Sequence, residues 1–460
     1  MITMILCLTG TKLLEALLPD KEFNKDINYR PSIYNYIFCY GTKIFLYNTM
    51  SRRLAHISKA EAEMLTQRSI CNSNFDSCTI LDFVAKRFLV PNGTDEAEHY
   101  IQLYSTLRMY ERGEKSGYTM FDILPTTCCN ARCFYCFEAG VEHKNMSFET
   151  ADAVFSFIKR ERNPDLKTEL SWFGGEPLCR TEIIDYICSK MREESIPFYS
   201  TMITNGYLWT PELINRAKKQ WMLNKAQITF DGFEEEHNFR KAYRMKDPDP
   251  FYHTINNIHQ LLEAGIAVVL RLNMDSKNIA SIWNLYAYLK TEFNNKERIV
   301  FSPAILAENW FEWSAERTSA QQKEVRKQWR LLRADINESG FSRFAALERS
   351  LPKFHCMANS VNSVTVQPDG KLYMCQTGDS SMLYGNVWEG ITRRDIVEQW
   401  SCNTNIRDMC RNCTWLPECT GFSMCPALPS DCDIEMEDKF IQRLKRTIQS
   451  LDKFNFTDNH

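Results

Sequence analysis

With 460 residues, 44% of them hydrophobic and 25% charged, the chain has the composition of a globular protein and is too long for one ordinary hydrophobic core. A formal net charge of −3 offers no basic surface for non-specific binding of nucleic acid, so we expect no nucleic-acid partner. No stretch approaches the roughly 18 to 20 apolar residues of a membrane span. Lys12 interrupts the apolar start before a secretory signal is complete. We therefore expect a cytoplasmic protein of several domains with no membrane partner.

An extension over residues 1–27 precedes a first predicted domain over residues 28–112. Apolar and polar residues alternate over 34–40 and 44–48 as in a hairpin, and Ser58 has the position of a helix cap. A second predicted helix over 79–87 leads into a short strand. This order resembles the winged-helix-like α+β domains that bind leader peptides in enzymes modifying ribosomally made peptides. A structural cap over the next domain is the alternative reading.

The region 113–310 alternates short β-rich runs with longer amphipathic runs, which indicates a parallel α/β sheet with right-handed connections. The ligand site of such a sheet lies at the carboxyl ends of its strands. We expect strands over 120–124, 170–173, 198–203, 226–230, 266–272 and 299–303. We expect helices over 148–161, 182–194, 211–219, 254–264 and 279–292.

Three cysteines, Cys129, Cys133 and Cys136, follow the first predicted strand with the spacing Cys-x3-Cys-x2-Cys. Three thiolates on one four-iron cube leave one iron without a protein ligand, and that iron can bind a small molecule. Gly174, Gly175 and Glu176 follow the second strand, where glycines permit close approach of a ligand and a carboxylate accepts hydrogen bonds from an amine. A zinc site or a trio of buried thiols is the structural alternative.

The two motifs together resemble the radical S-adenosylmethionine (SAM) enzymes, and the resemblance covers about residues 115 to 305. It implies a partial (β/α)6 TIM-like barrel. It also implies that Cys129, Cys133 and Cys136 are the catalytic cysteines, holding a [4Fe-4S] cluster that binds SAM and cleaves it to a 5'-deoxyadenosyl radical.

The same resemblance implies further contacts to SAM. It places Tyr135 beside the adenine, the Gly-Gly-Glu segment on the amino group, and one of three arginines, Arg240, Arg244 or Arg271, on the carboxylate. The sequence does not separate these three arginines, and His237 is expected to be structural. The expected cofactor-binding residues are Tyr135, Gly174, Gly175, Glu176, Thr204, Asn205, Asp231, Arg240, Arg271 and Asn273.

A helical linker over 311–350 is expected before a cysteine-rich tail over 351–460, which resembles the SPASM domain that holds two auxiliary [4Fe-4S] clusters. By this resemblance, Cys410, Cys413, Cys419 and Cys432 would hold the distal cluster, and Cys356, Cys375 and Cys425 the proximal one. Cys402 or a substrate thiolate would complete the proximal site. A pair of structural zinc sites is the alternative.

The combined resemblance implies a maturase that modifies a ribosomally synthesised precursor peptide, forming a thioether or carbon–carbon cross-link. An external electron donor such as flavodoxin or ferredoxin would reduce it, and we expect a monomer. The first alternative is a sulfatase-maturing, formylglycine-generating enzyme, in whose family an aspartate follows the second tail cysteine. This chain has Gln376 there, which removes a proton acceptor. The alternative of another class is a non-catalytic metal-cluster binding protein.

Overall fold

The computed structural model describes part of the chain. The described residues are 5–6, 22–66, 77–113, 117–140, 142–245, 249–294, 297–306, 320–341, 357–377, 379–401, 406–419, 440–441, 443–445 and 447–448.

The largest element of the fold is a ten-stranded sheet with the strand order β12-β11-β10-β9-β8-β7-β13-β14-β15-β16. Its first six strands in chain order pair in parallel with their neighbours. They are β7 (Met120–Ile123), β8 (Thr168–Trp172), β9 (Phe198–Thr204), β10 (Leu223–Phe230), β11 (Ala267–Met274) and β12 (Ile299–Ile305). All six expected strands are present, within three residues of the expected boundaries, as a partial barrel-like parallel sheet.

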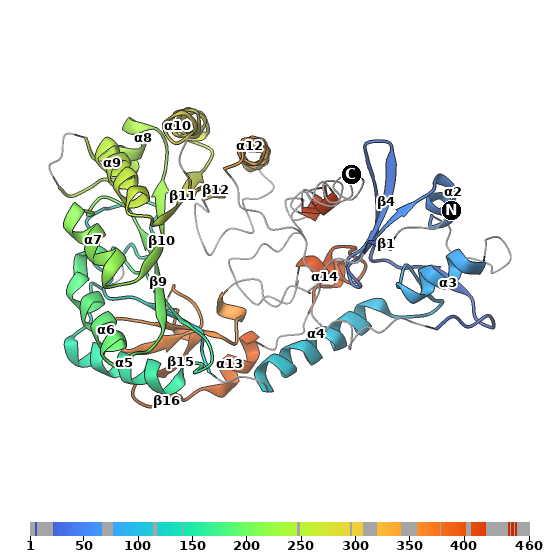
Figure 1. Cartoon of the computed structure of the whole chain (residues 1–460), viewed down its shortest axis with the longest axis horizontal. Coiled ribbons are helices and arrows are strands. Elements are labelled where there is room, and N and C mark those ends of the chain that lie inside the picture. The colour runs from blue at the N-terminus through green and yellow to red at the C-terminus, as the bar shows by residue number, and fades with distance from the viewer. Residues whose placement is uncertain are drawn as a thin grey trace, which may run out of the picture.

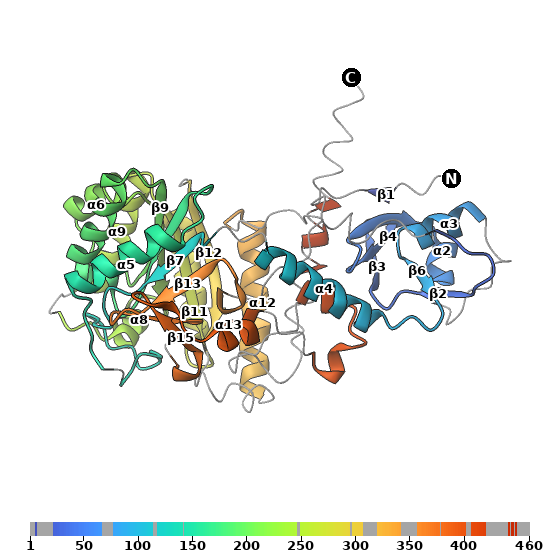
Figure 2. The same ribbon diagram turned by 90° about the horizontal axis from the view of Figure 1, so that it is seen from below.

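Helices connect these strands and cover one face of the sheet, as Figure 2 shows for α5, α6 and α9. Apolar side chains at alternate strand positions, such as Phe121, Leu170 and Ile228, pack against the helices in the largest hydrophobic core. The connecting helices are α5 (Phe148–Glu161), α6 (Thr181–Glu193), α7 (Pro211–Lys219), α8 (Glu234–Lys241), α9 (Pro250–Glu263) and α10 (Ile279–Glu292).

The tail of the chain extends the barrel sheet beyond its first strand. Strand β13 (Ser363–Val366) pairs in parallel with β7, and β14 (Lys371–Tyr373) pairs with β13 in the antiparallel direction. Strands β15 (Leu383–Asn386) and β16 (Gly390–Ile391) complete this edge, followed by α13 (Arg394–Ser401). The cysteine pattern of the tail did not predict these strands. They place the residues after β14 beside the loop that carries Cys129, Cys133 and Cys136, which is called the cysteine loop below.

The N-terminal region forms a separate body, which Figure 1 shows joined to the barrel through α4 (Glu96–Gly113). The expected hairpin is present as β3 (Asn35–Tyr40) and β4 (Lys43–Asn48), in a sheet of order β1-β5-β4-β3. Ser58 caps α2 (Lys59–Met64) through a reciprocal capping box with Glu61. The remaining elements are β1 (Ile5–Leu6), β2 (Tyr29–Pro31), β5 (Arg53–Ile57), α3 (Ser77–Ala85) and β6 (Leu89–Pro91).

Helices α4, α8 and α12 (Ala320–Glu338) were not individually predicted, although α12 lies within the expected helical linker. Near the tail cysteines, the described part of the chain forms α14 (Leu416–Cys419). None of the described helices combines the length and the apolar character that crossing a membrane requires.

Candidate active site

The cysteine loop follows β7 at the carboxyl end of the parallel strands. Cys129, Cys133 and Cys136 are partly buried free thiols. The amide of Arg132 donates to the carbonyl of Lys241 at 2.8 Å, which ties the loop to the end of α8. Burial, with added repulsion from Glu176, raises the pKa of Cys129 to about 12, so a metal that binds there must displace a proton.

The glycine pair after β8 lies directly against the start of the cysteine loop. Gly175 donates its amide to the Thr126 carbonyl at 3.1 Å, and a Cβ at Gly175 would lie 2.4 Å from the carbonyl oxygen of Cys128. Gly174 has a φ of +118° and an equally close neighbour, the carbonyl oxygen of Thr126 at 2.2 Å from its ideal Cβ. Only glycine fits at these two positions without displacing backbone.

Glu176 is fully buried and holds the loop after β8 to the loop after β9. Its carboxylate accepts hydrogen bonds from the Thr204 hydroxyl at 2.8 Å and from the backbone amide of Asn205 at 2.7 Å. Burial raises the pKa of this carboxyl to about 7, and these bonds act in the opposite direction. Glu176 therefore supports Thr204 and Asn205, which line the cavity beside the cysteine loop, and does not itself line it.

Asp231, after β10, organises a buried polar cluster. Its carboxylate accepts from the Tyr135 hydroxyl at 2.6 Å and the Asn273 amide at 2.9 Å, and it pairs with the Lys241 ammonium at 3.1 Å. Lys241 also donates to the Tyr135 oxygen at 3.1 Å. Lys241 is missing from the sequence-based list, although its position four residues after His237 places both on one face of α8.

The arginines named from the sequence have different environments. Arg240 is buried and donates two hydrogen bonds to Asp275, at 2.6 and 3.1 Å, so its guanidinium is held away from the cavity. Arg271 lines the cavity, where burial lowers its pKa, and donates to Asn273 at 3.0 Å. Arg244 is exposed. Among the described residues, Lys241 and Arg271 are the two cations that line the cavity.

His237 is fully buried among aromatic rings, with its ring 4.7 Å from that of Phe230. Burial, together with the Lys241 charge, lowers the pKa of His237 to about 3. A neutral imidazole packed in this way fits the structural role expected for it.

These elements surround a cavity of about 310 Å³. The tail enters it as well, because Cys375, Gln376 and Thr377 follow β14 and line its wall. Its other lining residues are Cys129, Ala131, Cys133, Tyr135, Cys136, Phe137, Glu138, Phe173, Gly174, Gly175, Ile203, Thr204, Asn205, Gln227, Thr229, Lys241, Arg271, Asn273 and Leu306. The three cysteines of the loop therefore share one cavity with amide, hydroxyl and cationic side chains, a lining that suits a polar ligand.

Behind Gln376 lies a buried carboxyl group that the sequence did not indicate. Asp122 on β7 accepts a hydrogen bond from the Ser171 hydroxyl at 2.8 Å. Burial raises the pKa of Asp122 to about 7, while the side chains of Gln376 and Ser171 act in the opposite direction. A carboxyl group therefore lies next to the residue that replaces the aspartate of the sulfatase-maturing pattern.

The other described tail cysteines lie elsewhere in the fold. Cys410, Cys413 and Cys419 belong to a short loop that packs on the N-terminal body. Cys356, Cys402, Cys425 and Cys432 lie outside the described residues. In the described ranges, no three histidine, cysteine, aspartate or glutamate side chains are grouped as ligands of one metal ion.

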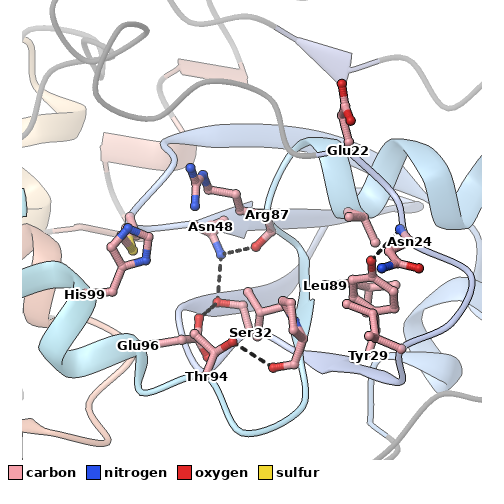
Figure 3. Close-up of a pocket in the computed structure, with 15 residues that line it drawn as sticks. Glu22, Asn24, Tyr29, Ser32, Asn48, Arg87, Leu89, Thr94, Glu96 and His99 are labelled. Atoms are coloured by element: carbon pink, nitrogen blue, oxygen red, sulfur yellow. Dashed lines mark hydrogen bonds between the residues drawn. The ribbon is translucent and has the colours of Figure 1, made fainter.

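A second cavity, of about 170 Å³, lies in the N-terminal body (Figure 3). Asn48 bridges its wall by donating to the Ser32 hydroxyl and the Arg87 carbonyl, both at 3.1 Å. Tyr29 and Leu89 supply apolar surface. Its size is comparable to a cavity that binds benzene.

Comparison with known proteins identifies the family that the barrel resembles. The model of the Radical SAM superfamily matches residues 123–289. An uncharacterized protein of Methanocaldococcus jannaschii is 22% identical over 275 residues, which are 57% of this chain and 86% of that protein. The Fe-coproporphyrin III synthase of Methanosarcina barkeri is 25% identical over 170 residues, which are 36% of this chain and 40% of the synthase. The chain thus spans less than half of the length of the synthase.

Solved structures share the fold at low sequence identity. The structure of anSMEcpe with bound AdoMet has a TM-score of 0.56 at 15% identity, and the match covers 72% of this chain and 98% of that one. Streptococcus suis SuiB bound to its precursor peptide SuiA has a TM-score of 0.51 at 15% identity, over 89% of this chain and 98% of that one. The superfamily model that matches residues 123–289 implies a [4Fe-4S] cluster and SAM. The chain therefore contains a radical SAM domain, and its cysteine loop lies inside the matched residues.

Proposed function

We propose that this protein is a radical SAM enzyme that cross-links a ribosomally synthesised precursor peptide through a thioether or carbon–carbon bond. The observation that carries the proposal is the position of Cys375, which lies on the wall of the cavity that also holds Cys129, Cys133 and Cys136. A tail cysteine that faces the SAM cavity can hold an auxiliary cluster within reach of a substrate bound there.

Cys129, Cys133 and Cys136 would hold the cluster, which would supply one electron for the reductive cleavage of SAM. The chain's own residues bind and orient SAM in this proposal. The glycine turn and Thr204 and Asn205 lie beside the bound amino acid portion, and Lys241 and Arg271 neutralise its carboxylate. Tyr135 is held in place by Asp231 and contacts the nucleoside.

The presence of the N-terminal body favours a precursor peptide over a folded sulfatase as the substrate. The likeness to SuiB covers 89% of this chain, whereas the likeness to anSMEcpe covers 72%. Structures of both proteins include bound peptides. In this proposal the N-terminal body binds the leader, whose backbone pairs with a sheet edge, and the cavity in Figure 3 accepts one apolar side chain of the leader.

Two observations support the sulfatase-maturing alternative. They are the TM-score of 0.56 to anSMEcpe and the carboxyl group of Asp122 beside Gln376. Asp122 does not line the cavity, so it has no direct path to a substrate in this conformation. We therefore retain peptide cross-linking as the main function.

The test is anaerobic reconstitution with iron and sulfide, followed by iron counting and assay of reductant-dependent 5'-deoxyadenosine release. We expect about twelve irons in the wild type, and about eight with no release in a Cys129→Ala/Cys133→Ala/Cys136→Ala variant. Incubation with a short peptide encoded beside the gene should give a product that has lost a pair of hydrogens, detected by mass spectrometry. Release that survives the triple variant contradicts the assignment. A reconstituted protein that never cleaves SAM favours a non-catalytic binding protein.

A further inference from the structure

The loop that carries three tail cysteines is seated on the N-terminal body, although more than three hundred residues separate them in sequence. Figure 1 shows α14 beside β4, and the contacts agree. Cys410 and Leu416 share a hydrophobic cluster with Tyr34, Met50 and Tyr100. A second cluster joins Trp415 to the β3–β4 hairpin and to Phe440.

A buried ion pair fixes this contact. A guanidinium nitrogen of Arg52 lies 2.7 Å from the Glu418 carboxylate, and each side chain is 1% exposed. The Tyr47 hydroxyl donates to the same carboxylate oxygen at 2.6 Å. Removing one partner of such a pair leaves an uncompensated buried charge, so the tail loop and the N-terminal body are energetically linked.

Hydrogen bonds to the main chain reinforce the ion pair. The Thr49 hydroxyl donates to the carbonyl of Thr414 at 2.5 Å, and the Thr414 hydroxyl donates to the carbonyl of Ile33 at 2.9 Å. Arg52 itself has a φ of +54°, in the left-handed region that an arginine seldom adopts. The N-terminal body holds this residue in a rare conformation while its side chain reaches the tail.

The anchored residues are the immediate neighbours of cysteines. Thr414 directly follows Cys413, and Glu418 directly precedes Cys419. A shift of either anchor would therefore move the adjacent cysteine side chain as well.

We propose that the N-terminal body is a structural part of the distal auxiliary-cluster site, and that Arg52 and Glu418 are positioning residues for Cys419. This inference rests on the proposed function, because it takes Cys410, Cys413 and Cys419 as ligands of a cluster. It assigns to the N-terminal body a role beyond peptide recognition, since an enzyme without this body would also lack the support of that cluster.

The test is reconstitution of the full chain with iron and sulfide, without any peptide. Iron per chain, the electron paramagnetic resonance (EPR) spectrum of the reduced protein and dithionite-dependent cleavage of SAM are measured together. The variants are Glu418→Gln, Arg52→Met and Arg52→Met/Glu418→Met. The control is Arg30→Met, which breaks the 2.7 Å ion pair of Arg30 with Glu96 inside the same body.

We expect Glu418→Gln and Arg52→Met to lose about four of about twelve irons, together with one auxiliary EPR signal, while SAM cleavage continues. The double variant should recover iron, because an apolar pair restores the contact without a buried charge. Tyr47→Phe retains both charges and should show an intermediate loss, which keeps the test open if a charge variant fails to fold. The Arg30→Met control should retain all of its iron.

A full iron count and unchanged spectrum in Glu418→Gln and Arg52→Met would overturn the inference. A Cys410→Ala/Cys413→Ala/Cys419→Ala variant separates this failure from that of the proposed function. If the cysteine variant loses iron and Glu418→Gln does not, only the positioning role fails. If the cysteine variant keeps all of the iron, the auxiliary cluster itself is wrong.

Discussion

The ammonium of Lys241 lies 3.1 Å from the carboxylate of Asp231, and both side chains are buried beside the cysteine loop. Asp231 also holds the Tyr135 hydroxyl, so one carboxylate orients an aromatic ring and a cation that line the same cavity. The pair gives a physical reason for a lysine in a buried position: its charge is compensated on one side and available to an anionic ligand on the other.

Replacing Lys241 with methionine should weaken SAM binding by about 10- to 100-fold, the value of one charge-assisted hydrogen bond. Lys241→Arg, which keeps the charge, should retain most of the affinity. Equilibrium dialysis of SAM against the reconstituted protein measures both. Arg240→Met is the contrasting variant: it breaks the pair with Asp275 and lowers stability, but should leave the dissociation constant of SAM unchanged. A large loss of affinity in Arg240→Met alone would reverse this assignment.

Gly175→Ala should abolish assembly of the SAM-binding cluster. The added Cβ would lie 2.4 Å from the Cys128 carbonyl oxygen and 2.5 Å from that of Thr127, and both are backbone atoms that cannot rotate away. The loop that carries Cys129 would have to move. Iron counting should show a loss of about four irons. Gly140→Asn is the control, because nothing lies within 4 Å of that position and asparagine tolerates its positive φ.

Under the proposed function, in which Cys375 holds an auxiliary cluster, Cys375→Ala should uncouple SAM cleavage from product formation. The three cysteines of the loop remain intact, so 5'-deoxyadenosine release should persist, whereas cross-linked peptide should disappear with the auxiliary cluster. Chromatography of both products from one reaction gives the comparison. Cys188→Ala, at a buried thiol inside the helix layer, is the matched control and should leave both products. Normal cross-linking by Cys375→Ala would contradict a role for this thiol.

Asp122→Asn should become more stable relative to the wild type as the pH rises. Burial raises the pKa of this carboxyl from 3.8 to about 7 in the folded protein, so the folded state holds a proton that the unfolded state has released. The wild type therefore loses stability as the pH rises toward and through the folded pKa of Asp122. The Asp122→Asn variant has no proton to release there and does not lose stability in this way. We expect a relative gain of about 1 kcal/mol between pH 6 and pH 8. Urea denaturation at the two pH values measures it, and a gap that stays constant would show that Asp122 is ionised throughout.

The strands of the barrel were predictable because each is a short β-rich run between longer amphipathic segments. The helices over 148–161, 211–219 and 279–292 match the structure at both ends. Helix α8 was missed because its first turn holds Glu234, Glu235 and Glu236 and its sequence has little apolar periodicity. Its stability comes from burial of His237 and Lys241, which depends on tertiary contacts.

The candidate site was predictable where the backbone makes strict demands, as at Gly174 and Gly175. It was less predictable for charges. Adjacent residues on a helix point in different directions, so Arg240 and Lys241 have different partners. The sequence alone does not show which of the two side chains faces the cavity until the buried face of the helix is known. The pairing of Arg52 with Glu418 joins distant segments and left no local signal.

The parallel pairing of β13 with β7 has a consequence for synthesis of the chain. Strand β7 and its five parallel successors leave the ribosome well before β13, so the outer edge of β7 has no partner from the tail during that interval. An open strand edge is a template for pairing with other chains. Co-translational folding would thus pass through an intermediate prone to aggregation, and a barrel expressed without its tail should require a chaperone or form inclusion bodies.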